Sequence, residues 1–453
     1  MKPVTQHFQF VSTLPFSPEK VFSWHLQPGA LERMLPRWIN CKVIQAGSPS
    51  DVGSLTVLEM TMFSITKIWK ARHVDFFPGT GFVDEQQTGP FPYFRHTHLI
   101  TAAGVESTLT DSIEYLAPWY IPDGYIRRQL QRQFMFRHKR LLSDLLVMER
   151  YPLPPRRILI SGGSGLVGSS LSFFLKVAGH SVFYLKRGLS DLQHNIIGWD
   201  PENLGGYQIE EFEGFDMIIH LAGENIGKRP WTKKQKQRLF TSRCRDTEQL
   251  AQILLSTKTP PKLFISASAV GVYGDRGCEL LTEESKASDD FLASLCSAWE
   301  MASSCLDTIG VRRIQARFGY ILDPQGGMLQ SILPVFRMGL GGKMGSGRQM
   351  IPWVALDDVV YALYHCLAHT DLSGPVNIVA PHCVSQQEFA KTLAKSIRRF
   401  SCCSIPAWVI KLLLPQRAEA LMLRSAHVVP IKLKKGGYEF IYSDLIDYFI
   451  QNV

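Results

Sequence analysis

The 453-residue chain is too long for one ordinary hydrophobic core and long enough for two or three domains. Hydrophobic residues make up 45% and charged residues 20%, a globular balance that excludes extensive disorder, and no apolar run is long enough to predict a membrane span. The formal net charge of +9 comes from dispersed basic residues without an RNP, helix-turn-helix or zinc-finger pattern, so we expect no nucleic-acid partner.

The nine cysteines are scattered along the chain. The two closest, Cys402 and Cys403, are adjacent, which is poor geometry for a disulfide or a shared zinc ion. This usage predicts reduced, mostly buried thiols. The N-terminus carries no apolar stretch behind its charge, so no secretory signal is expected. We therefore expect a cytoplasmic protein, and the sequence leaves its oligomeric state open.

Residues 1–150 are dominated by strand-like alternation of apolar and polar side chains. A short helix over 18–24 follows the first strand, and apolar residues at helical spacing over 125–149 predict one long amphipathic helix. The expected strands are 8–11, 53–58, 65–69, 82–84, 96–100 and 107–111. An early strand, short helices, an antiparallel sheet and a final helix predict an α+β domain.

This order of elements resembles the START-like, Bet v 1-type (SRPBCC) helix-grip domains. The segments 82–86, 89–91 and 96–98 carry the resemblance. It implies a cavity for a small-molecule ligand between the sheet and the long helix. His96 and His98 share one strand face, as metal ligands do, but the sequence shows no third ligand. Structural or cavity-lining histidines are therefore favoured, and no metal site is predicted.

Clustered prolines in residues 151–155 resist both helix and central strand, which predicts a linker between two domains. Over 156–188, an apolar strand, a glycine turn that opens a helix, and a second strand form a dinucleotide-binding pattern. Bare glycines let backbone N–H groups approach a pyrophosphate at the positive end of a helix. The residues predicted to bind the cofactor here are Gly162, Ser164, Gly165, Leu166, Val167 and Gly168. The alternative is an ordinary glycine turn.

The second strand of this unit ends in two cations, Lys186 and Arg187. NAD sites usually place an acid at this position, where it accepts hydrogen bonds from the ribose hydroxyls. Two cations instead suit the additional 2′-phosphate of NADP. We therefore predict NADP(H) in preference to NAD(H). The alternative is a pair of solvated cations at the end of a strand.

Two later apolar segments, 215–223 and 262–268, read as buried parallel strands that end in small residues. Ligands bind at the carboxyl ends of strands in doubly wound sheets, and small side chains there let a nicotinamide and its ribose lie close to the backbone. Ordinary turns between strand and helix are the alternative. The residues predicted to bind the cofactor at these ends are Leu221, Ala222, Gly223, Ser266, Ala267 and Ser268.

These motifs together resemble the extended short-chain dehydrogenase/reductases, and more closely the atypical subgroup described as epimerase family proteins (short-chain dehydrogenase family 39U-like). The resemblance implies a Rossmann doubly wound parallel sheet over 156–453, an NAD(P) cofactor, and a small C-terminal substrate lobe at about 375–453. The segments that carry it are 162–168, 199–201, 220–223, 266–274, 282–284, 317–319, 341–347, 352–354 and 430–433.

The sequence departs from working epimerases at the catalytic pair. Extended members use Tyr-x-x-x-Lys to move a proton while the nicotinamide moves hydride. Here Leu292 stands in place of the tyrosine and Cys296 in place of the lysine, and Arg243 replaces the family's active-site asparagine. Ser268 remains as a hydroxyl for the substrate oxygen, and Tyr273 is the other candidate catalytic residue, with a packed turn residue as its alternative.

Two functions fit this pattern. The first is an NADP(H)-dependent oxidoreductase of unusual mechanism, acting on a small apolar or carbonyl substrate that the N-terminal cavity delivers or senses. The second is a non-catalytic NADPH-binding sensor or ligand carrier, in which cofactor binding alters a cavity or a surface. The substrate and the relation between the two predicted domains are not fixed by the sequence.

Overall fold

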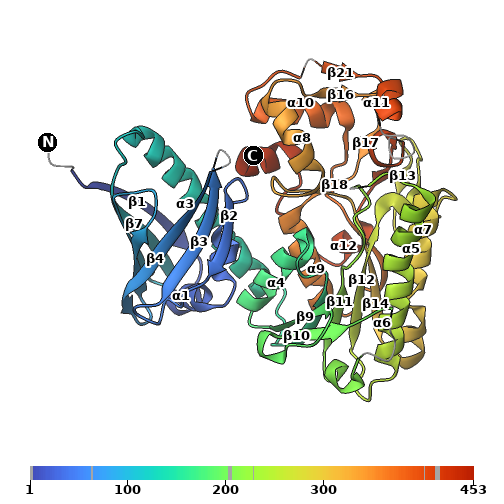
Figure 1. Ribbon diagram of the computed structural model, residues 1–453, viewed down its shortest axis with the longest axis horizontal. Helices are drawn as coiled ribbons and strands as arrows, with labels where there is room; N and C mark the ends of the chain where they lie inside the picture. The colour runs from blue at the N-terminus through green and yellow to red at the C-terminus, as the bar shows by residue number, and fades with distance from the viewer. Residues whose placement is uncertain (1–3, 63–64, 203–206, 228, 402, 414–418) are drawn as a thin grey trace. The chain divides into compact units, whose positions relative to one another are not determined.

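Two seven-stranded sheets organise the chain in the computed structural model (Figure 1). The structure describes residues 4–62, 65–202, 207–227, 229–401, 403–413 and 419–453. One compact unit comprises the residues up to Arg150 together with Lys176–Gly179, and the other comprises Tyr151–Leu175 and His180–Val453. We call them the N-terminal unit and the C-terminal unit. The proline-rich segment 151–155 lies directly after the division, before the first strand of the second sheet.

The sheet of the N-terminal unit is antiparallel, with strand order β1-β7-β6-β5-β4-β3-β2. Its first and last strands in the sequence are neighbours and pair over nine positions, from Gln6 opposite Tyr115 to Leu14 opposite Ser107. Alternate residues face inward, as the period of a strand requires. The strands are β1 (Gln6–Leu14), β2 (Asn40–Gln45), β3 (Leu55–Met62), β4 (Ile65–Phe77), β5 (Gly81–Thr88), β6 (Tyr93–Ala103) and β7 (Glu106–Leu116).

Three helices accompany this sheet: α1 (Pro18–Leu26), α2 (Ala30–Met34) and α3 (Asp123–Arg150). Ser17 caps α1 by accepting a hydrogen bond from the Lys20 backbone N–H, and Pro18 occupies the first turn, where its missing N–H costs nothing. The buried face of α3 includes Phe134, which packs in one cluster with Phe8 of β1 and Tyr115 of β7. The unit is thus α+β, and its likeness to START domains stays a prediction.

The sheet of the C-terminal unit is parallel throughout, with order β10-β9-β8-β11-β12-β14-β19. Central strands such as Ile158–Ile160 are buried on both faces, which explains their continuous apolar sequence. Figure 1 shows α4 and α9 on one face and α5, α6 and α7 on the other. The predicted Rossmann-like parallel sheet is confirmed. The strands are β8 (Arg157–Ser161), β9 (Ser181–Arg187), β10 (Ile196–Trp199), β11 (Met217–His220), β12 (Leu263–Ala269), β14 (Arg312–Phe318) and β19 (Gly374–Ile378).

The helices of this unit include α4 (Leu166–Val177), α5 (Lys233–Phe240), α6 (Asp246–Leu255), α7 (Phe291–Met301), α8 (Gly327–Arg337), α9 (Leu356–Ala368), α10 (Gln386–Ser396), α11 (Ala407–Leu413), α12 (Ile431–Lys435) and α13 (Leu445–Asn452). Helices α8, α10 and α13 share one apolar cluster, in which Trp353 is fully buried. Within the described residues, no helix combines the length and the apolar composition needed to cross a membrane. The short strands are β13 (Leu280–Leu281), β15 (Tyr320–Leu322), β16 (Gly342–Met344), β17 (Met350–Ile351), β18 (Trp353–Ala355), β20 (Val384–Ser385), β21 (Cys403–Ile405) and β22 (His427–Val428).

Candidate functional site

The glycine turn after β8 is held so tightly that side chains are excluded at two positions. Gly162 has a φ of +71°, and a Cβ there would lie 2.8 Å from the Ala222 backbone nitrogen. A Cβ on Gly168 would lie 2.3 Å from the Gly162 carbonyl oxygen. The protein atom nearest to a Cβ on Gly165 would be the Gly162 carbonyl oxygen, at 3.2 Å. The missing side chain at Gly165 therefore leaves room for a ligand. This cradle fits a dinucleotide pyrophosphate at the start of α4.

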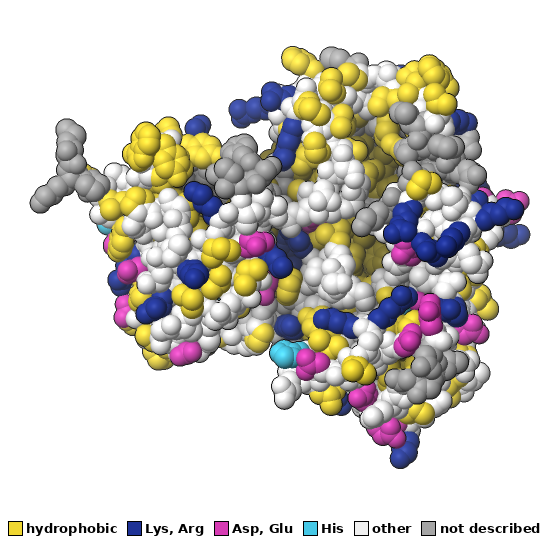
Figure 2. Space-filling model, viewed as in Figure 1, with side chains coloured by type: hydrophobic (Ala, Val, Ile, Leu, Met, Phe, Trp, Pro, Cys, Tyr) yellow, Lys and Arg dark blue, Asp and Glu magenta, His cyan; other side chains and the backbone are white. Residues whose placement is uncertain are grey.

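A pocket of about 390 Å³ opens at this turn. Figure 2 shows the face of the C-terminal unit hollowed, with hydrophobic side chains inside and Lys and Arg side chains around it. Seven predicted cofactor residues line the pocket: Gly162, Gly165, Leu166, Val167, Gly168, Leu221 and Ala267. Sequence reasoning missed six more at and beyond the end of β14, although a strand's carboxyl end is itself a signal: Phe318, Gly319, Tyr320, Ile321, Gly327 and Met328.

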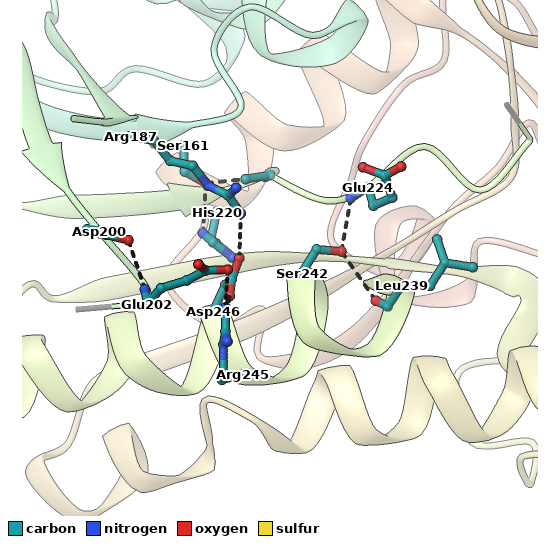
Figure 3. A network of polar contacts seen from close by, with 11 residues as sticks. Ser161, Arg187, Asp200, Glu202, His220, Glu224, Leu239, Ser242, Arg245 and Asp246 are labelled. Carbon is teal, nitrogen blue, oxygen red and sulfur yellow. Dashed lines mark hydrogen bonds and ion pairs between the residues drawn. The ribbon is translucent and has the colours of Figure 1, made fainter. Parts of the chain in front are cut away.

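The other predicted cofactor residues lie outside the pocket lining. Ser164 is exposed on the glycine turn. Ala222 and Gly223 follow β11, in a loop positioned by Ser161, whose Oγ accepts from the Leu221 and Ala222 N–H groups at 3.1 and 3.2 Å. The same Oγ lies 2.7 Å from Nδ1 of His220. Burial lowers the pKa of the His220 imidazole to about 4. A neutral His220 thus holds this loop (Figure 3).

Two guanidinium groups meet at the end of β9. Arg187 donates to Oδ2 of Asp246 at 3.2 Å, and Arg245 donates to Oδ1 of the same carboxylate at 3.1 Å (Figure 3). The Arg187 side chain is 68% exposed, so it can reach a ligand. Lys186 lies 5.7 Å from the centre of the Tyr184 ring. Sequence patterns did not indicate Arg245, because its place beside Arg187 depends on how the chain folds.

The two candidate catalytic hydroxyls are engaged by protein partners. Ser268 donates to Oε1 of Glu300 at 2.6 Å, and the guanidinium of Arg317 donates to both oxygens of that carboxylate at 2.8 Å. Tyr273 donates to Oδ1 of Asn377 at 2.6 Å and accepts from Arg317 at 2.9 Å. Burial raises the pKa of Tyr273. Both side chains therefore belong to one buried polar network, and their catalytic roles stay predictions.

Cys296, in the place of the family's lysine, lies on α7 and is buried. Burial, reinforced by Glu300, raises the pKa of its thiol to about 12, although Arg243 acts in the opposite direction. The thiolate is therefore scarce at neutral pH. Leu292, in the place of the tyrosine, is buried on the same helix and packs with Trp231 and Leu239.

Arg243, like Ser266 and His220, has a buried side-chain atom without a hydrogen-bond partner. It lies in a π-helical turn, Thr241–Arg245, a rare conformation that often marks functional sites. Its guanidinium carbon is 5.0 Å from the Trp299 ring centre, and a Cβ on Gly223 would lie 3.4 Å from that carbon. Its Nη1 is buried without a hydrogen-bond partner. A buried donor of this kind is costly unless it serves a ligand.

A second pocket, of about 630 Å³, lies against the C-terminal lobe. Arg424 links it to the site, because this side chain pairs with Asp290 at 2.9 Å and donates to the Gly271 carbonyl oxygen at 3.3 Å. A Cβ on Gly271 would lie 3.8 Å from Sγ of Cys296. The lining is polar and apolar in nearly equal parts: Asp275, Ser288, Asp290, Gly345, Ser346, Gln349, Ala407, Lys411, Leu423 and Arg424.

The parallel sheet, the glycine cradle and the pocket define a nucleotide-binding protein of the Rossmann class. Residues 158–379 match the NAD dependent epimerase/dehydratase family, and residues 405–449 match a domain of unknown function. An epimerase family protein of Mycobacterium bovis is 33% identical over 288 residues, 64% of this chain and 94% of the relative. YfhF of Bacillus subtilis, another epimerase family protein, is 32% identical over 292 residues, 64% and 95% of the two chains. The chain belongs to this epimerase family.

The solved structures that resemble this chain include the following two. The nucleoside-diphosphate sugar epimerase from Corynebacterium glutamicum is 30% identical, with a TM-score of 0.81, over 98% of this chain and 90% of that one. The human epimerase family protein SDR39U1, solved with NADPH, is 29% identical, with a TM-score of 0.60, over 65% of this chain and 97% of that one. The family and its NAD(P)-binding fold are therefore confirmed.

Proposed function

We propose that the protein is an NADP(H)-dependent oxidoreductase in which Arg243 stabilises negative charge on the oxygen of a small carbonyl substrate. The observation that carries this proposal is the buried, unpaired Nη1 of Arg243 beside Gly223, in the loop that follows β11. A fixed donor in a water-poor site stabilises an oxyanion strongly, because it needs no reorganisation during the reaction. Arg also remains charged despite burial, which lowers its pKa from a very high starting value.

The remaining groups have supporting roles in this proposal. When bound, a nicotinamide dinucleotide supplies hydride transfer. Gly165 and its neighbours hold the pyrophosphate, and the loop positioned by Ser161 supports the nicotinamide end. The pocket beside Arg424 takes the substrate, and its mixed polar and apolar lining suits a small carbonyl compound. The product alkoxide takes its proton from water, since the Ser268 and Tyr273 hydroxyls are already engaged.

Replacing Arg243 tests this role. Arg243→Met is expected to lower the kcat of NADPH oxidation about 100- to 1000-fold, the usual loss for one oxyanion donor, while NADPH affinity stays nearly unchanged. The measurement is absorbance at the reduced nicotinamide band with a panel of aldehydes and ketones, and fluorescence titration for affinity. Arg238→Met, on the exposed face of α5, is the matched control. Equal rates in the two variants would disprove the role of Arg243.

Preference for NADP(H) is part of the proposal. Arg187 and Arg245 flank the region where a 2′-phosphate would sit, and the human relative was solved with NADPH. Arg187→Glu is expected to weaken NADPH binding by about 2–4 kcal/mol and NADH binding little, because a charge-assisted contact becomes a repulsion. Calorimetry with both nucleotides measures this, with the exposed Lys258→Glu as control. An equal loss for both nucleotides would contradict the proposal.

The second candidate is an NADPH-binding sensor or carrier without turnover. The engaged hydroxyls of Ser268 and Tyr273 and the raised thiol pKa of Cys296 favour it. Tight NADPH binding with no NADPH oxidation across the carbonyl panel would support this candidate and contradict the oxidoreductase.

We also propose that the N-terminal unit is a START-like helix-grip domain that binds a small molecule. Its order of one strand, two helices, six strands and a long helix supports this, as does the packing of α3 against β1 and β7.

A further inference from the structure

The inward face of the N-terminal sheet carries a row of histidines and carboxylates on four neighbouring strands. His73 of β4 lies opposite Asp84 of β5, and Asp84 lies opposite His96 of β6. Two residues further along β6, His98 lies opposite Asp111 of β7. Directly opposed residues have Cβ atoms about 5 Å apart, so this register places all five side chains in one cluster.

Asp111 holds the two neighbouring histidines of β6. Its Oδ1 lies 2.8 Å from Nε2 of His96 and 2.7 Å from Nδ1 of His98, and its Oδ2 lies 2.6 Å from Nε2 of His138 on α3. A carboxylate on one ring nitrogen fixes the ring and leaves the other nitrogen to act as a ligand. For His98 that other nitrogen, Nε2, faces Asp84, 3.5 Å from Oδ2.

Asp84 completes a set that the sequence did not reveal. One ligand atom from each of Asp84, His96 and His98 lies within 4.8 Å of the other two. Nδ1 of His73 approaches Oδ1 of Asp84 to 2.5 Å, yet both atoms are buried and neither is aligned for a hydrogen bond. Close but misaligned polar atoms in a buried site are rare in a network held by hydrogen bonds alone, and they point to a common cationic partner.

The cluster brings together two kinds of metal ligand. The carboxylates of Asp84 and Asp111 lie beside the imidazoles of His96 and His98. His138 of α3 contacts Asp111 at 2.6 Å, and the His25 ring of α1 lies 6.1 Å from the His98 ring, centre to centre. Carboxylate oxygens and imidazole nitrogens therefore meet in one buried site.

We propose that the N-terminal unit binds a divalent transition-metal ion through Asp84, His96 and His98, with Asp111 orienting both imidazoles. Imidazole nitrogen and carboxylate oxygen are ligands of Zn²⁺ and Fe²⁺. Three protein ligands leave a coordination position open, as in metal sites that bind an exchangeable ligand. The Asp84 side chain is 21% exposed, which provides a path for entry.

Metal titration of the full chain tests this proposal. Protein stripped with a chelator and then freed of it is titrated calorimetrically with ZnCl₂, and separately with CoCl₂ to record visible spectra. We expect one equivalent per chain in the wild type and at least a tenfold loss of affinity in Asp84→Asn. Asp75→Asn is the matched control, because Asp75 is a half-exposed carboxylate on β4 that pairs with Arg95. Its affinity should equal that of the wild type.

Three outcomes would overturn the proposal: no Zn²⁺ binding by folded wild-type protein, equal binding by Asp84→Asn and Asp75→Asn, or loss of the bound ion in His382→Ala. The last variant removes an exposed histidine that pairs with Asp444 at 2.8 Å in the C-terminal unit. If Asp84→Asn does not fold, X-ray absorption of zinc-loaded wild-type protein decides, because two imidazole ligands must appear in its spectrum. NADPH affinity, a property of the C-terminal unit, should not change on metal removal.

Discussion

Glu300→Ala is expected to destabilise the protein by about 3–5 kcal/mol, because it leaves the guanidinium of Arg317 buried without its carboxylate. Arg317 makes two hydrogen bonds of 2.8 Å to Glu300, and Ser268 donates to the same carboxylate. Removal of this carboxylate therefore leaves three donors without their acceptor at once. Urea denaturation followed by far-UV circular dichroism measures the free energy of unfolding, with unchanged slope as evidence that the transition is the same.

A double variant separates charge from packing. Glu300→Leu with Arg317→Met replaces the ion pair by apolar side chains, and such replacements are often neutral, so much of the lost stability should return. Glu284→Ala removes an exposed acid and should change the free energy of unfolding by less than about 0.5 kcal/mol. A loss below about 1 kcal/mol for Glu300→Ala would show that the network around Ser268 and Tyr273 contributes little.

Two alanine substitutions in the glycine turn should separate folding from cofactor binding. Gly168→Ala places a methyl group 2.3 Å from the Gly162 carbonyl oxygen, so the turn must shift, at a cost of about 3 kcal/mol. Gly165→Ala places its methyl group 3.2 Å from the same oxygen, which small adjustments accommodate. In the proposed binding mode that methyl group points toward the pyrophosphate, so NADPH affinity should fall about 100-fold, or about 2.7 kcal/mol, with little change in stability.

Thermal unfolding without nucleotide and fluorescence titration with NADPH measure the two effects. The informative result is their opposite pattern: Gly168→Ala lowers the melting temperature, while Gly165→Ala lowers affinity at a nearly unchanged melting temperature. If Gly165→Ala binds NADPH with the affinity of the wild type, the pyrophosphate does not bind at this turn. Stability equal to wild type in Gly168→Ala would show that the turn relaxes without strain.

Sequence patterns predicted those elements whose structure is determined by residues close together in the chain. The apolar runs at 158–160 and 217–219, together with the glycine spacing, predicted the parallel sheet and most of the residues around the cofactor pocket. Strand β2 was missed. It lies at the edge of its sheet with mostly exposed side chains, so its sequence lacks the buried alternation that marks an inner strand.

Contacts between distant residues were beyond the sequence patterns. Nothing in residues 268–317 indicates that Glu300 binds both Ser268 and Arg317, because the bond depends on how α7 packs against β12 and β14. The unpaired Nη1 of Arg243 also results from packing, because the residue type alone does not indicate whether a donor is buried. Asp84 joins His96 and His98 through strand register, which a single sequence does not specify.

The pairing of β1 with β7 also has a consequence for how the chain is made. Gln6 pairs with Tyr115, more than a hundred positions later, so β1 is synthesised well before the strand with which it pairs. Pairing between strands so far apart in the sequence slows folding, because the chain between them loses conformational entropy before the contact stabilises the sheet. Until then the edge of β1 is unpaired, and nascent chains truncated before residue 107 should depend on chaperones.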